Sequence, residues 1–283
     1  MSLSSEIKLG PRTIRDTLVV AAPAALCFDL MVRLDRAPQF FASHLNAEIS
    51  AGTEGGETVD RWVIAEGGQV RSWRAVRKVD ECARVIEFGH AGPARPPIVS
   101  VRGRWSFTAE SPTTTAVTLE HVVKVADDAD ADADATDRAL RGIEAGSRAQ
   151  LEQLQAVAER HDELLAQTVQ TDATVLVSMP AEAVRNGLVD LVTASGGVGV
   201  RLPGDAVVAK WRSARGPVAT VRARVATERR ADGGVLVAVS AEATAGRPAV
   251  SRAALTRWLR WRLRTALTEF AGLVGDGQLV WTR

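Results

Sequence analysis

Alternating apolar and polar residues predict two neighbouring strands between Thr58 and Asp80, joined at Gly67 and Gly68. Because glycine adopts positive φ angles at little cost, this arrangement is typical of a β-hairpin. Side chains alternate across a strand, so the odd-numbered positions of the second arm share one face. That face carries Arg71, Trp73, Ala75, Arg77 and Val79. If it points inward, a buried arginine needs a charged partner or a ligand. A solvated edge strand is the alternative.

The rest of residues 13–167 predicts a strand, two short helices, a run of antiparallel strands and one long helix. Pro23 opens the first short helix, where its missing N–H costs nothing. The second is expected over residues 39–44, and the long amphipathic helix over residues 136–167. The strands are expected at residues 13–21, 47–51, 57–65, 69–79, 84–89, 99–109 and 115–125. A curved antiparallel sheet leaves one concave face open, which the long helix can cover to enclose a cavity.

Residues 172–274 repeat this order of elements at shorter length. Pro180 opens a helix as Pro23 does, and a second helix is expected over residues 251–274. Strands are expected at residues 173–179, 198–201, 206–212, 218–229 and 235–243. The repeated order indicates an internal duplication.

The composition excludes several classes of protein. The chain has 283 residues, is 46% apolar and carries a formal net charge of +1, so it shows no overall bias toward nucleic acid or membrane. With only Cys27 and Cys82, neither a disulfide framework nor a zinc site is encoded. No signal peptide and no apolar run of about 20 residues is present, so we expect a soluble cytoplasmic protein.

One low-complexity run, residues 127–134, consists of aspartate and alanine. We interpret it as a solvated loop that ends in an acidic cap for the following helix. A calcium site is disfavoured, because the run lacks the glycine and the terminal glutamate of an EF-hand loop. We therefore expect no metal.

Four short motifs in residues 13–125 resemble those of a known family. They are V-x-A-P-A at residues 20–24, P-Q-F-F at 38–41, G-x-V-x-S-W-x-x-x-R at 68–77 and P-P-x-x-x-x-x-G-x-W at 96–105. In this order and spacing they resemble the aromatase/cyclases of bacterial aromatic polyketide synthesis, within the START-like, Bet v 1-like helix-grip superfamily. The duplicated layout resembles the didomain branch of that family.

The resemblance implies an α+β fold of two helix-grip domains, each a curved antiparallel sheet wrapped on a long C-terminal helix. Residues 1–167 would form the domain with the pocket, and residues 168–283 a shortened, divergent second domain that is noncatalytic or altered in role. The implied activity is aldol closure and dehydration of a poly-β-ketone to an aromatic ring, without metal or organic cofactor. The implied partner is an acyl carrier protein, with other synthase subunits as further candidates. A noncatalytic carrier for a hydrophobic aromatic polyketide or lipid, and a structural subunit of the synthase, are the alternatives.

The resemblance also places the expected site residues. Arg77 stands at the position of the family's site arginine, Trp73 and Trp105 match pocket-lining tryptophans, and Phe41 matches an aromatic residue near the mouth. His44 replaces a frequent tyrosine. Residues Arg71, Ala75, which replaces a frequent serine, and Val101 complete the expected substrate-binding set.

The chemistry of ring closure agrees with these residue types. A guanidinium at Arg77 can stabilise the developing oxyanion, and His44 or His121 can act as base and then as acid. Three alternatives stay open: Arg77 paired with a carboxylate, His44 in solvent at a helix end, and His121 as a hydrogen-bonded interior residue.

The C-terminal half is basic. Residues 168–283 hold 16 Lys and Arg against 9 Asp and Glu, a net charge of +7. Within residues 251–274, Arg257, Arg260 and Arg264 lie on one stripe and apolar residues on another. Docking of an acidic carrier protein would suit this charge, and a solvated basic face on a core-covering helix is the alternative.

Overall fold

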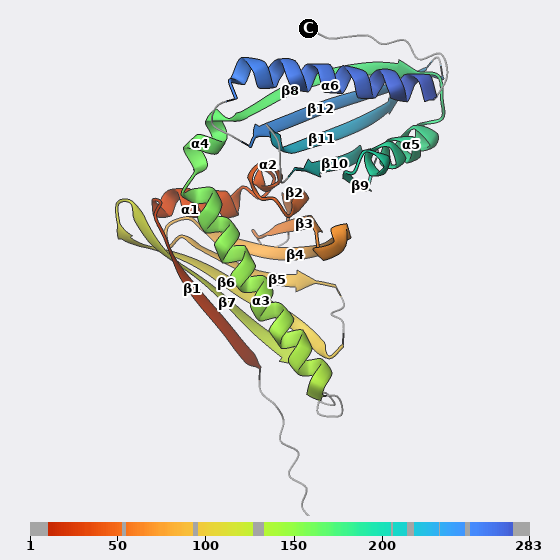
Figure 1. Cartoon of the computed structure of the whole chain (residues 1–283). Coiled ribbons are helices and arrows are strands. Elements are labelled where there is room, and N and C mark those ends of the chain that lie inside the picture. Colours follow the sequence, from red (N-terminus) through yellow and green to blue (C-terminus); the bar gives the residue numbers. More distant parts are fainter. Residues whose placement is uncertain are drawn as a thin grey trace, which may run out of the picture. The chain divides into compact units, whose positions relative to one another are not determined.

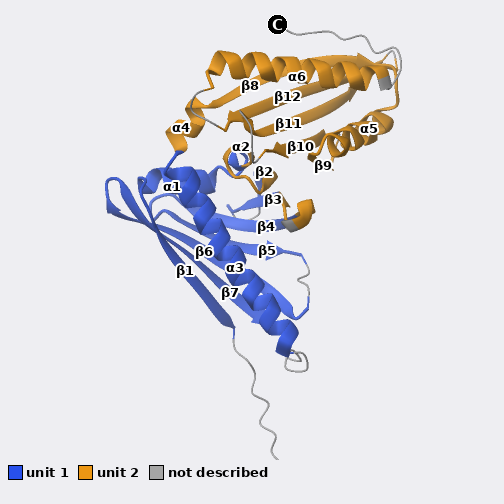
Figure 2. Ribbon diagram, in the orientation of Figure 1, with its two compact units in different colours: residues 1–37, 47–61, 72–160 blue, residues 38–46, 62–71, 161–283 orange. Residues whose placement is uncertain are grey.

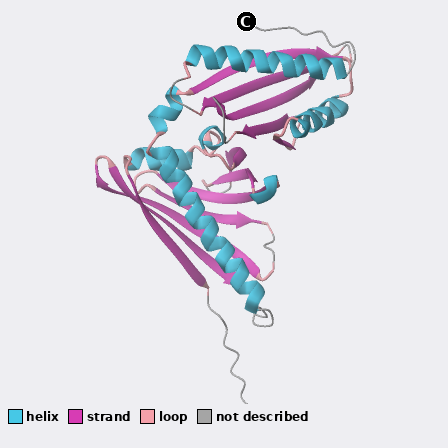
Figure 3. Cartoon of the chain, in the orientation of Figure 1, coloured by secondary structure: helices cyan, strands magenta, loops and turns pink. Residues whose placement is uncertain are grey.

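The computed structural model describes residues 11–52, 55–92, 96–126, 133–204, 206–213, 218–231, 233–246 and 250–273. Figure 3 shows an α+β protein in which helices pack on antiparallel sheets. In the N-terminal half the elements are β1 (Arg12–Val20), α1 (Ala24–Val32), α2 (Ala37–Phe40), β2 (His44–Ala51), β3 (Glu57–Ile64), the 3₁₀ turn η1 (Glu66–Gly68), β4 (Val70–Asp80), β5 (Val85–Ala91), β6 (Ile98–Ser111), β7 (Thr114–Val125), α3 (Ala133–Ala158) and α4 (His161–Ala166). In the C-terminal half they are β8 (Thr168–Val177), α5 (Ala181–Ala194), β9 (Val198–Arg201), β10 (Ala206–Arg212), β11 (Val218–Arg229), β12 (Val235–Ala245) and α6 (Arg252–Leu273).

The first sheet has seven strands in the order β1-β7-β6-β5-β4-β3-β2. Helix α3 lies across it and packs on α1, β1 and β7 (Figure 1). Its buried stripe consists of Ser147, Leu151, Leu154, Val157 and Ala158, at the three- and four-residue spacing of one helix face. Full burial of a leucine such as Leu154 contributes about 2 kcal/mol. This packing fixes the helix over one face of the sheet.

The odd-numbered face of β4 points inward from Trp73 onward, whereas Arg71 at the beginning of the strand is exposed. Ala75 and Arg77 are buried and Trp73 is half-buried, whereas Arg74 and Val76 are exposed. Both Gly67 and Gly68 have positive φ angles, 75° and 80°, in the 3₁₀ turn that joins β3 to β4. The alternation of the sequence therefore determines which side chains of the hairpin face the interior.

The second sheet has five strands in the order β8-β12-β11-β10-β9. Helix α6 packs on β8 and β12, and α5 packs on β9, β10 and β11. The predicted apolar stripe of α6 is buried at Leu255, Leu259, Leu267 and Phe270. This half thus repeats the sheet-and-long-helix plan with fewer strands.

Contacts among Cα atoms divide the chain into two compact units (Figure 2). Unit 1 comprises residues 1–37, 47–61 and 72–160, and unit 2 comprises residues 38–46, 62–71 and 161–283. One cluster of unit 2 joins Leu45, Trp62 and Ile64 to Leu202, Ala206 and Val208. The domain boundary between residues 167 and 168 stays a prediction.

Three predicted element boundaries were wrong. The helix expected over residues 39–44 ends at Phe40, and β2 begins at His44. The helix expected to reach residue 167 divides into α3 and α4, with a turn at residues 159–160. The strand expected from residue 173 begins at Thr168, because it pairs with β12 from Thr244 onward.

The composition raised three questions: the structure of the acidic run, a metal site and a membrane-spanning helix. Most of the acidic run, residues 127–132, lies outside the described residues. Across the described ranges, His, Cys, Asp and Glu side chains nowhere gather in a group of three that could hold a metal ion. The described helices include none that is long and apolar enough to cross a membrane.

Candidate functional site

Unit 1 contains a cavity of about 180 Å³ between the inner face of the first sheet, α1 and α3. Six of the nine residues predicted for the site line it: Trp73, Ala75, Arg77, Val101, Trp105 and His121. The lining also includes Arg61, Phe88 and His90, for which no role was predicted. The cavity therefore collects cationic, imidazole and aromatic groups on a largely apolar surface.

Arg77 is buried and lies against the C-terminal end of α1. Its Nε donates to the Glu57 carboxylate at 2.7 Å, Nη1 donates to the Met31 carbonyl at 2.9 Å, and Nη2 donates to the Val32 carbonyl at 2.5 Å. The last carbonyls of a helix have no partner within the helix, so Arg77 both satisfies two of them and balances the negative helix end. Arg77 is therefore paired with a carboxylate, which was the predicted alternative to a role in the site. A ligand could interact only with its remaining N–H donors and with its charge.

Arg61 brings a second guanidinium to the same cavity. Its Cζ lies 5.1 Å from the centre of the Trp73 ring, the geometry of a cation–π contact. Burial, and to a smaller extent the charge of Arg77, lowers the pKa of Arg61 to about 10, so the group stays charged at neutral pH. The sequence carried a signal for this position, since Arg61 shares the strand face of Val59 and both line the cavity.

His121 is a buried side chain of β7 that contacts α3. Its Nδ1 lies 3.0 Å from Ser147 Oγ, and that hydroxyl lies 2.9 Å from the Ile143 carbonyl. The Ser147 O–H donates to the carbonyl, which can only accept, so Oγ accepts from an Nδ1–H of His121. The Nε2 atom then carries the lone pair. Burial, with a smaller contribution from His90, lowers the pKa of His121 to about 4, so the imidazole is neutral at pH 7.

Two aromatic rings complete the wall beside His121. Phe88 meets the imidazole edge-on with ring centres 5.6 Å apart and also stacks on His90. Its ring covers Gly103, the glycine of the fourth motif, where an added Cβ would lie 2.2 Å from the Phe88 ring. Glycine at this position therefore leaves room for the tip of the Phe88 ring, which lines the cavity.

His90 lies in β5, is exposed, and lines the same cavity. Burial on one side and the charge of Arg61 lower its pKa below the usual value for histidine. Because its ring lies 6.2 Å from that of Trp73, it forms part of the aromatic wall.

The other three predicted residues do not line this cavity. Arg71 is exposed at the beginning of β4. Phe41 and His44 are buried in unit 2, where their rings stack with centres 5.1 Å apart. His44 is thus neither in solvent nor beside Arg77, and nothing in the geometry supports a catalytic role for it.

Lys210 explains why the chain turns at these residues. Its buried Nζ donates to the carbonyls of Pro38, Phe41 and His44 at 2.9, 2.7 and 2.9 Å. Pro38 lies within α2, while Phe41 and His44 follow its end, where the helix no longer supplies N–H donors for their carbonyls. The predicted helix over residues 39–44 therefore gives way to a loop. Burial, followed by the charges of Arg222 and Arg212, lowers the pKa of Lys210 to about 7.

Comparisons with known proteins confirm the resemblance inferred from the motifs. Residues 20–139 match the family model described as polyketide cyclase / dehydrase and lipid transport. The granaticin polyketide synthase bifunctional cyclase/dehydratase of Streptomyces violaceoruber is 29% identical over 143 residues, which are 50% of this chain and 43% of that protein. The actinorhodin counterpart of Streptomyces coelicolor is 28% identical over 151 residues, 53% of this chain and 45% of that protein. The matched region spans less than half of either relative.

Solved structures confirm the predicted fold of two helix-grip domains. The di-domain ARO/CYC BexL from the BE-7585A biosynthetic pathway has a TM-score of 0.72 at 19% identity, over 94% of this chain and 98% of that one. The di-domain ARO/CYC StfQ from the steffimycin biosynthetic pathway has a TM-score of 0.68 at 22% identity, over 92% and 96% of the two chains. Both matches extend over both units, so the didomain architecture is shared.

Proposed function

We propose that this protein is a polyketide aromatase/cyclase, which folds a poly-β-ketone and promotes aldol closure and dehydration of one ring in the cavity of unit 1. The names of the two curated relatives, each a bifunctional cyclase/dehydratase of a polyketide synthase, support this class of reaction. The observation that carries the proposal is the meeting of two guanidiniums and a neutral imidazole in one aromatic-walled cavity.

The proposed reaction needs only proton transfers. Nε2 of His121 accepts a proton from a carbon between two carbonyls, and the resulting enolate carbon attacks a ketone carbon further along the chain. The new carbon–carbon bond leaves an alkoxide, which takes a proton, and loss of water with enolisation gives the aromatic ring. No oxidant, metal or organic cofactor is required by this balance.

Arg61 and Arg77 would stabilise the enolate and the alkoxide through their charge. In a buried site, fixed positive groups act on developing negative charge without reorganisation and with little screening. Three donors of Arg77 are held by Glu57 and α1, so Arg77 offers its remaining N–H donors and its charge, and Arg61 adds a second positive charge beside Trp73. Trp73 and Trp105 would hold the flat intermediate against the wall.

The size of the cavity favours closure of a single ring. A cavity of about 150 Å³ holds one benzene molecule. At about 180 Å³, the cavity of unit 1 has room for one six-membered ring and its substituents. The rest of the substrate would then extend through the mouth, as a chain tethered to an acyl carrier protein would. The exposed arginines of α6, Arg257, Arg260 and Arg264, are a candidate surface for such an acidic carrier.

The test is a product analysis with a reconstituted minimal polyketide synthase. Adding the protein should change the ring pattern of the products, and His121→Gln should reduce the new product by about 10²–10⁴-fold. Arg74→Gln, on the outer face of β4, is the matched control and should act as the unmodified protein does. An unchanged product pattern, together with tight binding of an aromatic polyketide, would instead support the noncatalytic carrier.

A further inference from the structure

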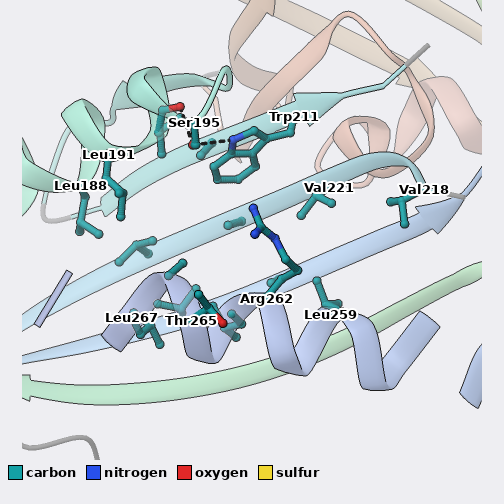
Figure 4. Close-up of a pocket in the computed structure, with 18 of the residues that line it drawn as sticks. Leu188, Leu191, Ser195, Trp211, Val218, Val221, Leu259, Arg262, Thr265 and Leu267 are labelled. Carbon is teal, nitrogen blue, oxygen red and sulfur yellow. Dashed lines mark hydrogen bonds between the residues drawn. The ribbon is translucent and has the colours of Figure 1, made fainter. Parts of the chain in front are cut away.

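Unit 2 contains a second cavity that the sequence did not predict. Its volume is about 430 Å³, more than twice that of the cavity in unit 1. It lies between α5, α6 and the strands β10 and β11 (Figure 4). Cavities of about 300–1,000 Å³ are typical of sites for organic ligands.

The lining of this cavity has little capacity for acid–base chemistry. Apolar side chains of both helices and the sheet dominate, among them Leu188, Leu191, Leu259 and Phe270. The only titratable side chains among the described lining residues are Arg212, Arg262 and Glu269. Since arginine remains protonated and one carboxylate offers no acid–base pair, the lining is suited to binding a ligand rather than to transforming it.

Trp211 provides a rigid aromatic wall. Its Nε1 donates to Ser195 Oγ at 3.0 Å, and that hydroxyl donates to the Val192 carbonyl at 2.9 Å. Gly197 leaves the space in which the indole lies, because a Cβ there would be 2.5 Å from the indole nitrogen. Trp258, half-buried on α6, lines the cavity as well. Two indoles, one of them held by a hydrogen bond, are a surface on which a flat conjugated ring can stack.

Arg262 places a positive charge at the opening of the cavity. It is exposed on α6 and extends toward Trp211 in Figure 4. Within the described ranges Arg262 makes no ion pair, and its guanidinium lies 5.7 Å from the centre of the Trp261 ring. Arg212 and Arg262 carry two positive charges, whereas Glu269 carries the one negative charge among the lining residues that the structure describes. A ligand that fits would place its apolar rings inside and an anionic group at the mouth.

We infer that unit 2 binds a flat fused-ring aromatic compound with one anionic substituent, such as a phenolate or carboxylate, and leaves it unchanged. If about 150 Å³ holds one benzene molecule, about 430 Å³ admits roughly two or three fused rings. This inference does not depend on the reaction proposed for unit 1, since it rests on residues of unit 2 alone.

The test uses the full chain and two fluorescent probes of matched shape. Anilinonaphthalene sulfonate carries fused rings and an anion, and N-phenylnaphthylamine has the same ring system without charge. Ala266→Phe fills the cavity from a half-buried lining position and should weaken binding of both probes at least tenfold. Arg262→Gln should weaken the anionic probe by about fivefold and leave the neutral probe nearly unchanged. Arg229→Gln, exposed on β11 and outside the lining, is the control and should change neither.

Two results would overturn the inference. One is unchanged binding of the anionic probe to both Ala266→Phe and Arg262→Gln. The other is loss of probe binding on filling the cavity of unit 1, as in Ala75→Leu, without a response to Ala266→Phe. Arg262→Gln alters an exposed side chain and does not disturb the core, so it remains informative if Ala266→Phe folds poorly.

Discussion

Replacing Arg77 by alanine should destabilise unit 1 severely. The substitution removes one charge-assisted bond to Glu57 and two bonds to carbonyls at the end of α1. Breaking a buried ion pair costs about 3–5 kcal/mol, and each buried carbonyl left without a donor costs about 1–3 kcal/mol. Glu57 is 38% exposed, so water can solvate its carboxylate once Arg77 is removed, and the lost ion pair lowers the free energy of unfolding by less than a fully buried pair would. We therefore expect a loss of about 3–5 kcal/mol in the free energy of unfolding.

The assay is thermal and urea-induced unfolding, followed by near-ultraviolet circular dichroism. At about 3 °C per kcal/mol, the midpoint should fall by roughly 10–15 °C. Arg74→Ala is the matched control, because Arg74 lies three residues earlier in the same strand and pairs with Asp60 on the exposed face. It should shift the midpoint far less, since solvent screens exposed ion pairs.

Equal midpoints for Arg77→Ala and Arg74→Ala would refute the role of Arg77 at the end of α1. If the expected loss is found, inactivity of Arg77→Ala will reflect the fold as well as the chemistry. Arg61→Gln and His121→Gln are then the better variants for testing the reaction.

Three further predictions follow from individual contacts. Between pH 6.5 and 4.5 the unfolded chain protonates His121, while the folded imidazole, with a pKa of about 4, stays neutral. The free energy of unfolding should therefore fall by about 2 kcal/mol as the pH decreases over this range. In urea titrations at several pH values, His121→Gln should remove this part of the pH dependence. Gly103→Ala should lower the free energy of unfolding by about 1–3 kcal/mol, because the added Cβ collides with Phe88. Gly142→Ala, whose Cβ would have no atom within 4 Å, should stabilise helix α3. A higher unfolding temperature for Gly103→Ala than for Gly142→Ala would contradict the packing. Lys210→Met should destabilise unit 2 by about 3 kcal/mol or more, because three buried carbonyls lose their donor, and a loss below about 1 kcal/mol would show that the ammonium is dispensable.

Strand alternation predicted much of the first cavity. It placed Trp73, Ala75 and Arg77 on one face of β4, and the structure shows the same alternation on β7, where Leu119, His121 and Val123 are buried. Such faces follow from the local geometry of a strand, so sequence alone is sufficient to predict them.

Contacts between distant residues could not be predicted in this way. His44 and Phe41 owe their position to Lys210, which follows them by more than 160 residues. The tautomer of His121 depends on Ser147, a helix residue whose rotation relative to the sheet no periodicity specifies. The cavity of unit 2 arises where helices and sheet leave space unfilled, and its volume depends on their separation rather than on the pattern of apolar positions.

The central claim is that ring closure takes place in the cavity of unit 1, and filling that cavity tests it most directly. Ala75→Leu adds three carbon atoms at a buried lining position. With the reconstituted synthase, this variant should lose the ring product formed by the unmodified protein, while Arg74→Ala should retain it and circular dichroism should show both variants folded. Full formation of the same product by a folded Ala75→Leu protein would contradict the claim.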